Sequence, residues 1–166
     1  MISAEQLAMS KAAERAFEAW LKREGFSYLA VCQDREHFAP LFKGNLKHPD
    51  FLILLESIGM IAVDVKGNTL SRGQYTLPYE EEWRLAMTFE QVFRLPVWYA
   101  YWDAKAGVAY WISALKAIEV GVERENHKDK KKFFAIKLRH FAQIATNADI
   151  GKLYTQRLPD HRKSKG

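Results

Sequence analysis

Two stretches of the chain place apolar residues at the spacing of an amphipathic α-helix. Residues 3–24 contain the first pattern, in which apolar positions recur three, four and seven residues apart and Gly25 follows as a stop signal. The second pattern spans residues 79–94 and ends before Pro96. We also expect a helix over residues 133–147.

Between the helices, short apolar runs rich in β-branched and aromatic residues predict strands. One run covers residues 26–32. Residues 51–66 hold two further runs on either side of a Glu-Ser-Ile-Gly turn, and residues 97–112 hold another two, so we expect two antiparallel hairpins. The order is helix, three strands, helix and strand, followed by another strand and a helix. This order indicates a mixed α/β (α+β) layer architecture.

The second hairpin is rich in large aromatic residues, which either form a stacking platform for unpaired nucleotides or belong to the core. Large aromatic side chains on both faces of adjacent strands favour packing between helices. The residues are Trp98, Tyr99, Tyr101, Trp102, Tyr110 and Trp111.

The composition is that of one globular unit. Of the 166 residues, 48% are hydrophobic and 27% are charged. A chain of this length buries roughly 68–70% of the surface that its unfolded form exposes, so it needs no disulfide or structural metal to hold a core. We expect a single domain over residues 1–150 and a basic C-terminal tail over residues 151–166.

The net charge of +5 is concentrated in two segments. Residues 124–132 hold five Lys or Arg against two acids, and residues 152–166 hold five against one, so the two segments carry +3 and +4 and the rest carries −2. Both segments are candidates for contacts with nucleic-acid phosphates. The alternative is that they are solvated segments that aid solubility.

Cys32 is the single cysteine, which excludes a disulfide framework and a zinc site made of cysteines alone. A reducing compartment, and hence a cytoplasmic location, is the expectation. The first 20 residues carry three glutamates and no uninterrupted apolar core, so we expect no signal peptide. No apolar run reaches transmembrane length, so we expect no membrane association.

The first hairpin brings charged residues together at one end. Positions paired across an antiparallel turn have a constant sum of residue numbers, and a turn centred near Ser57 pairs Asp50 with Asp64. Side chains alternate along a strand, so Lys66 emerges on the same face as Asp64. Opposed like charges destabilise a sheet, so Lys66, a bound divalent cation or both must compensate the two carboxylates.

Carboxylates without paired histidines or cysteines are ligands for Mg²⁺, or Mn²⁺, rather than for zinc. A metal held by Asp50 and Asp64 would polarise a phosphodiester and lower the pKa of an attacking water. Lys66 would orient that water or help to remove its proton. The alternative for these three residues is a structural ion pair that closes the hairpin.

Pro49-Asp50, a short strand and then Asp64-Val65-Lys66 resemble the PD-(D/E)XK signature of the restriction-endonuclease-like nuclease superfamily. The core order of that family, αβββαβ, matches the predicted order, and it implies a central mixed sheet flanked by helices. Two other acid-x-Lys triplets occur, but the one ending in Lys105 lies in a turn and the one ending in Lys131 lies in a basic segment. The triplet ending in Lys66 has the expected strand context.

Many members of the family take a further acid from the first helix. In a pattern similar to that of archaeal Holliday junction resolvases, this acid is followed by an apolar residue three later, Leu seven later and Gly eleven later. The matching residues are Glu14, Phe17, Leu21 and Gly25. The resemblance therefore assigns the helix acid to Glu14, and Glu18 stays open as an alternative.

The resemblance implies a Mg²⁺-dependent endo- or exonuclease that hydrolyses phosphodiester bonds in DNA. The implied catalytic residues are Glu14, Asp50, Asp64 and Lys66, and the three acids are the implied metal ligands. The expected partner is nucleic acid, with DNA favoured, and the family also implies a homodimer. Two alternatives stay open: a catalytically silent member that binds DNA or protein, and a metal-dependent hydrolase of another phosphate ester.

Overall fold

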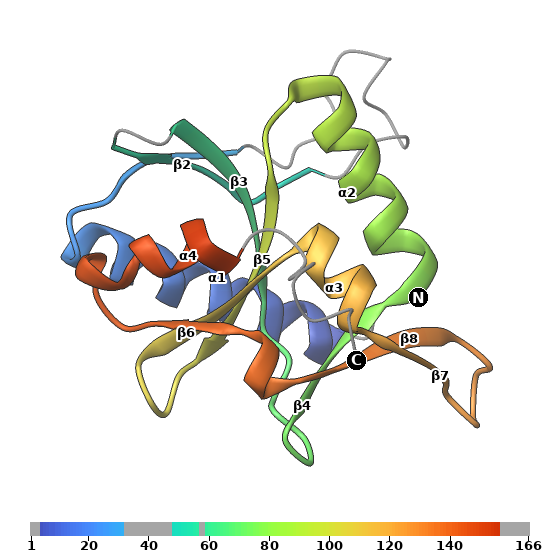
Figure 1. Ribbon diagram of the computed structural model, residues 1–166. Coiled ribbons are helices and arrows are strands. Elements are labelled where there is room, and N and C mark those ends of the chain that lie inside the picture. The colour runs from blue at the N-terminus through green and yellow to red at the C-terminus, as the bar shows by residue number, and fades with distance from the viewer. Residues whose placement is uncertain (1–3, 32–47, 57–58, 157–166) are drawn as a thin grey trace.

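The computed structural model describes residues 4–31, 48–56 and 59–156, and it contains two sheets with helices around them (Figure 1). The larger sheet has six strands in the order β1-β2-β3-β5-β6-β9. Within this sheet β3 and β5 run parallel and the other neighbours run antiparallel, so the sheet is mixed, as predicted. Its strands are β1 (Ser27–Ala30), β2 (Phe51–Leu55), β3 (Gly59–Lys66), β5 (Val97–Asp103), β6 (Val108–Ser113) and β9 (Ala142–Ile144).

A smaller antiparallel sheet has the order β4-β8-β7. Its strands are β4 (Gln74–Pro78), β7 (Val122–Glu125) and β8 (Lys132–Lys137). The helices are α1 (Ala4–Arg23), α2 (Tyr79–Phe93), α3 (Ala114–Val120) and α4 (Gly151–Gln156), with the 3₁₀ turns η3 (Leu138–His140) and η4 (Asn147–Asp149).

Both faces of the large sheet are covered. On one face, Phe17 and Trp20 of α1 and Leu153 of α4 share a core with alternate residues of the strands. On the other face, α2, α3 and the small sheet form a second core. Side chains of β3 divide between the two because they alternate: Val63 lies in the α1 core and Ala62 in the α2 core.

The first two helices and both hairpins are confirmed. Phe51 pairs with Val63, which is the register expected from the hairpin turn. The aromatic residues of β5 and β6 belong to the cores, as the packing interpretation predicted. Those that are at most 2% exposed are Trp98, Tyr99, Tyr101 and Trp111.

The helix expected over residues 133–147 is wrong, because this segment forms β8, η3 and β9. Its apolar residues fit a helical spacing, but Phe134 and Ile136 pack in the α2 core from an extended strand. β8 has a ladder partner on each side, β4 and β7. Neither β4 nor α3 was predicted. Pairing with distant strands therefore overrides the local pattern.

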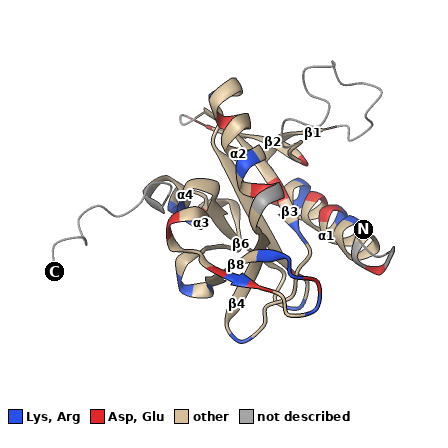
Figure 2. Ribbon diagram, turned by 90° about the vertical axis from the view of Figure 1, so that its right-hand side faces the viewer, with Lys and Arg blue, Asp and Glu red and all other residues tan. Residues whose placement is uncertain are grey.

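The basic segment 124–132 is largely the outer part of the β7–β8 hairpin, and Figure 2 shows its Lys and Arg residues together with acidic ones. The first six residues of the expected tail form α4, whose Leu153 is buried. Cys32 and residues 157–166 lie outside the described residues. In the described part of the chain, no helix has both the length and the apolar character needed to cross a membrane.

Candidate active site

The β2–β3 hairpin brings Asp50 and Asp64 to the same end of the large sheet. Phe51 pairs with Val63 across the hairpin. Asp50 directly precedes Phe51 in the chain, and Asp64 directly follows Val63. The Asp50 amide donates to the Val63 carbonyl at 2.9 Å, and the Asp50 carbonyl accepts from the Val31 amide at 2.9 Å. The backbone of Asp50 is thus held between β3 and the end of β1.

The carboxylate of Asp50 extends the ladder of β3. Its Oδ2 accepts a hydrogen bond from the Val65 amide at 2.6 Å. Amide groups of a strand point toward the neighbouring strand within the sheet, so this carboxylate lies near the plane of the sheet, between its two faces. It is therefore positioned by β3 itself.

Asp64 and Lys66 form a buried ion-pair cluster on the face covered by α2. Nζ of Lys66 lies 2.7 Å from Oδ2 of Asp64 and 2.7 Å from Oε1 of Glu82 in α2. The Lys66 and Glu82 side chains are each 14% exposed, and that of Asp64 is 7% exposed. The ring of Tyr99 flanks the ammonium, with its centroid 5.6 Å from Nζ.

This cluster keeps Lys66 protonated. Burial alone would lower the pKa of the Lys66 ammonium, but the adjacent carboxylates of Asp64 and Glu82 outweigh it and raise the pKa above its usual value. Burial, with the same two carboxylates, also raises the pKa of the Tyr99 hydroxyl well above its usual value.

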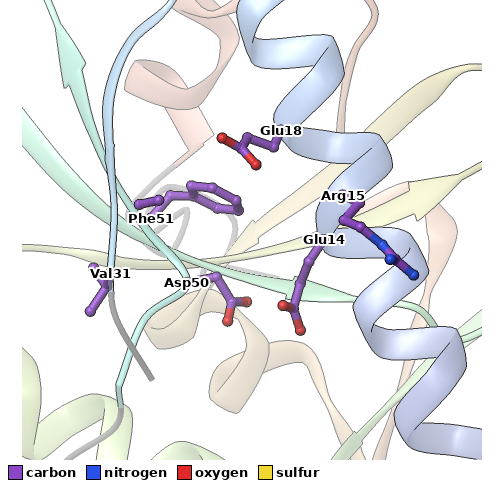
Figure 3. A pocket seen from close by; sticks show the side chains of 7 residues that line it. Glu14, Arg15, Glu18, Val31, Asp50 and Phe51 are labelled. Carbon is purple, nitrogen blue, oxygen red and sulfur yellow. The ribbon is translucent and has the colours of Figure 1, made fainter. Parts of the chain in front are cut away.

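Glu14 lies on the opposite face of the sheet, in α1. It lines a pocket of about 160 Å³ together with Asp50 and Glu18. Figure 3 shows the carboxylates of Glu14 and Asp50 pointing toward one another across this pocket. Glu18 instead accepts a hydrogen bond from the Tyr28 hydroxyl at 2.9 Å and pairs with Lys22 at 3.1 Å. The geometry thus favours Glu14 over Glu18 as the neighbour of Asp50.

Gly67, directly after β3, allows α1 to approach the site. A Cβ at this position would lie 3.0 Å from the Met9 carbonyl oxygen and 3.3 Å from the Ala13 Cβ. The absence of a side chain therefore lets α1 pack against the end of β3. Because Glu14 follows Ala13 in the helix, this contact also sets the position of Glu14.

The four predicted residues are divided between two faces. Glu14 and Asp50 share the pocket on the α1 side, and Asp64 and Lys66 form their pair on the α2 side. Among the described residues, no three His, Cys, Asp or Glu side chains form a group that could hold a metal ion. The donor type still fits Mg²⁺, which needs one or two protein carboxylates, with water and phosphate oxygens as its other ligands.

Glu82 was missed by the sequence analysis. It is one of three consecutive glutamates near the start of α2, and acids are common there because they stabilise the positive end of the helix dipole. Its contact with Lys66 depends on how α2 packs over β3, and no local pattern reports that packing.

A scan against protein-family models found no match, and a search of the curated proteins found no similar sequence. Among solved structures, the chain is similar to Hjc, a Holliday junction resolvase of the archaeal hyperthermophile Archaeoglobus fulgidus. That alignment has a TM-score of 0.51 and 18% identity, and it covers 81% of this chain and 96% of the resolvase.

A second similar structure is D212, a nuclease from a fusselovirus, with a TM-score of 0.49 and 11% identity over 85% of this chain and 87% of that chain. At 18% identity, the likeness to the resolvase shows the fold. The chain therefore has a mixed α/β fold of the restriction-endonuclease-like type, as the PD-(D/E)XK resemblance implied.

Proposed function

We propose that the protein is a metal-dependent nuclease that hydrolyses phosphodiester bonds in DNA. The observation that carries the proposal is the hydrogen bond from the Val65 amide to Asp50, since it joins Asp50 to the residue between Asp64 and Lys66. The fold, which is that of a known resolvase, supports the same conclusion.

In the proposed enzyme, Asp50, whose carboxylate lies between the two faces of the sheet, would hold Mg²⁺ or Mn²⁺ together with Glu14 on the α1 side and Asp64 on the α2 side. Glu14 and Asp50 face each other across the pocket, and Asp64 lies on the next strand. When bound, the cation supplies positive charge to the phosphodiester and lowers the pKa of the attacking water.

Lys66 has the chemistry to bind anionic oxygen atoms. Its ammonium lies 2.7 Å from both Asp64 and Glu82, and it would donate hydrogen bonds to a phosphate oxygen or to the attacking water. In the proposed enzyme Lys66 would orient the attacking water or help to remove its proton, the two roles expected from the sequence.

The basic β7–β8 hairpin supplies phosphate contacts in this proposal. Lys132 of β8 lies over the ring of Tyr79, with Nζ 5.8 Å from the ring centroid. Tyr79 is the first residue of α2, and Glu82 lies three residues further along the helix. The hairpin is therefore next to the end of α2 that contacts Lys66.

The test is cleavage of branched, single-stranded and linear DNA with Mg²⁺ or Mn²⁺ by the wild type and by Lys66→Ala. We expect the substitution to lower the rate about 10²- to 10³-fold, because it removes the charged donor that would bind the phosphate oxygen or the attacking water. Lys105→Ala is the matched control, since Lys105 ends another acid-x-Lys triplet but is exposed in the β5–β6 turn. A wild type that binds these substrates but cleaves none of them would contradict the proposal.

A catalytically silent protein that binds DNA or a protein partner is the second candidate. The ion pairs of Lys66 with both Asp64 and Glu82 favour it, because they satisfy the charge of the lysine without substrate or metal. A calorimetric titration with Mn²⁺ separates the two. The nuclease binds the ion and loses affinity in Asp64→Asn, whereas the silent protein shows no difference between the two chains.

A further inference from the structure

A carboxylate outside the predicted set reaches the candidate catalytic lysine. Glu82 Oε1 lies 2.7 Å from Lys66 Nζ, as close as Asp64 Oδ2 does. Lys66 is therefore held from two directions, by its own strand and by α2. Glu82 and Lys66 are each 14% exposed, so solvent screens this contact only weakly.

The large sheet fixes the position of Glu82. The Tyr99 hydroxyl donates a hydrogen bond to the backbone carbonyl of Glu82 at 3.2 Å. Tyr99 is also the residue of β5 that pairs with Asp64 of β3. One side chain thus sets the start of α2 relative to the strand that carries Asp64 and Lys66.

We propose that Glu82 is a positioning residue for Lys66, an inference that rests on the function proposed above. That function uses Asp64 twice, as a ligand of the cation and as a partner of Lys66. When Asp64 binds the cation, Glu82 keeps the Lys66 ammonium at the site. Without Glu82, Lys66 and Asp64 form a one-to-one ion pair that competes with the cation for Asp64.

The test compares steady-state DNA cleavage by the wild type, Glu82→Gln and Glu82→Asp. Glu82→Gln keeps the size of the side chain and removes its charge, and we expect kcat to fall about 10- to 100-fold. The KM for DNA should stay the same, because Glu82 acts through Lys66 and not on the substrate. Glu82→Asp keeps the charge with a shorter reach, so it should recover part of the lost kcat.

Two further variants separate positioning from a general effect of charge or stability. Tyr99→Phe keeps the ring and removes the hydrogen bond to Glu82, so it should lower kcat by less than Glu82→Gln does. Glu119→Gln removes one negative charge from an exposed position of α3 and should leave kcat unchanged. Thermal unfolding of each variant shows which of them are folded.

An active wild type with an equally active Glu82→Gln overturns this inference and leaves the proposed nuclease intact. The inference is also overturned if Glu82→Gln and Glu119→Gln lose the same amount of kcat, or if Glu82→Gln changes only KM. If the wild type cleaves no DNA, the proposed function fails and the role of Glu82 fails with it. If Glu82→Gln does not fold, Glu82→Asp and Tyr99→Phe decide: reduced kcat at unchanged KM supports positioning, and wild-type kcat in both overturns it.

Discussion

Two buried tryptophans of the α1 core differ in one hydrogen bond. Nε1 of Trp20 donates to the Ala145 carbonyl at 2.9 Å. None of the described residues accepts a hydrogen bond from Nε1 of Trp111, which is buried. Both rings pack against Phe17 and both side chains are fully buried. Trp20 therefore joins α1 to the end of β9 through a polar contact as well as through packing.

Replacing each tryptophan by Phe separates these contributions. Trp20→Phe leaves the Ala145 carbonyl without its donor, whereas Trp111→Phe removes a buried N–H group that has no acceptor among the described residues. We expect Trp20→Phe to lower the free energy of unfolding by about 1–3 kcal/mol more than Trp111→Phe does. Urea denaturation of both variants measures this difference. Equal losses in the free energy of unfolding would show that the hydrogen bond from Trp20 to Ala145 does not stabilise the protein.

At the scale of elements, contact between α1 and the end of β3 joins the N-terminal helix to the site. The added Cβ of Gly67→Ala would meet the backbone of Met9 at 3.0 Å, so α1 has to shift. We expect a loss of about 1–3 kcal/mol in the free energy of unfolding. We also expect slower DNA cleavage, because Glu14 moves with the helix.

Gly151→Ala is the control for this substitution, since the Cβ that it adds has no atom of the described residues within 4 Å, apart from its own neighbours in α4. Thermal unfolding and the cleavage assay are compared for the two variants. A Gly67→Ala protein as stable and as active as Gly151→Ala would show that the close approach of α1 does not position Glu14.

The strands that the sequence predicts well are those that pair with the next strand along the chain. β2 and β3 pair across a short turn, so the alternation of apolar residues and the turn together determine which residues face each other. For this reason the hairpin pattern alone predicts the register that brings the backbones of Asp50 and Asp64 to the same end of the sheet. Glu14 was placed by helical spacing and by the family pattern.

Prediction failed where the partner lies far along the chain. β4 pairs with β8, from which it is separated by α2, β5, β6, α3 and β7. A local pattern holds no information about such a partner, so residues 133–147 were assigned to a helix and β4 was not assigned at all. The contact between Glu82 and Lys66 was missed for the same reason, because it requires the position of α2 over β3.

At the scale of the whole molecule, positive charge and the candidate site are carried by different parts of the fold. Figure 1 shows the β7–β8 hairpin extending from the body of the protein, and this hairpin holds most of segment 124–132, whose net charge is +3. The candidate site is rich in carboxylates. In the nuclease proposed above, the acidic centre would bind the cation and the basic hairpin would bind the phosphate backbone.

The proposed contact between this hairpin and DNA predicts a change in salt dependence. Lys128 and Lys131 are exposed near its turn, and replacing both by Ala should reduce the slope of log K against log salt by about 2. Binding should weaken to the same extent on DNA of different sequences. Lys105→Ala should not change the slope, and an unchanged slope in the double variant would contradict the role of the hairpin.

β3 lies in the interior of the large sheet, between β2 and β5. Its last residues pair with β5, and the Val65 amide is held by Asp50 on the other side. Separating the backbone of Asp64 and Lys66 from the neighbouring strands therefore requires the sheet to split along its middle. Such a split is a global unfolding event, whereas an edge strand or a chain end can fray locally. The arrangement of Asp64 and Lys66 and the native state should consequently disappear in a single cooperative transition on heating.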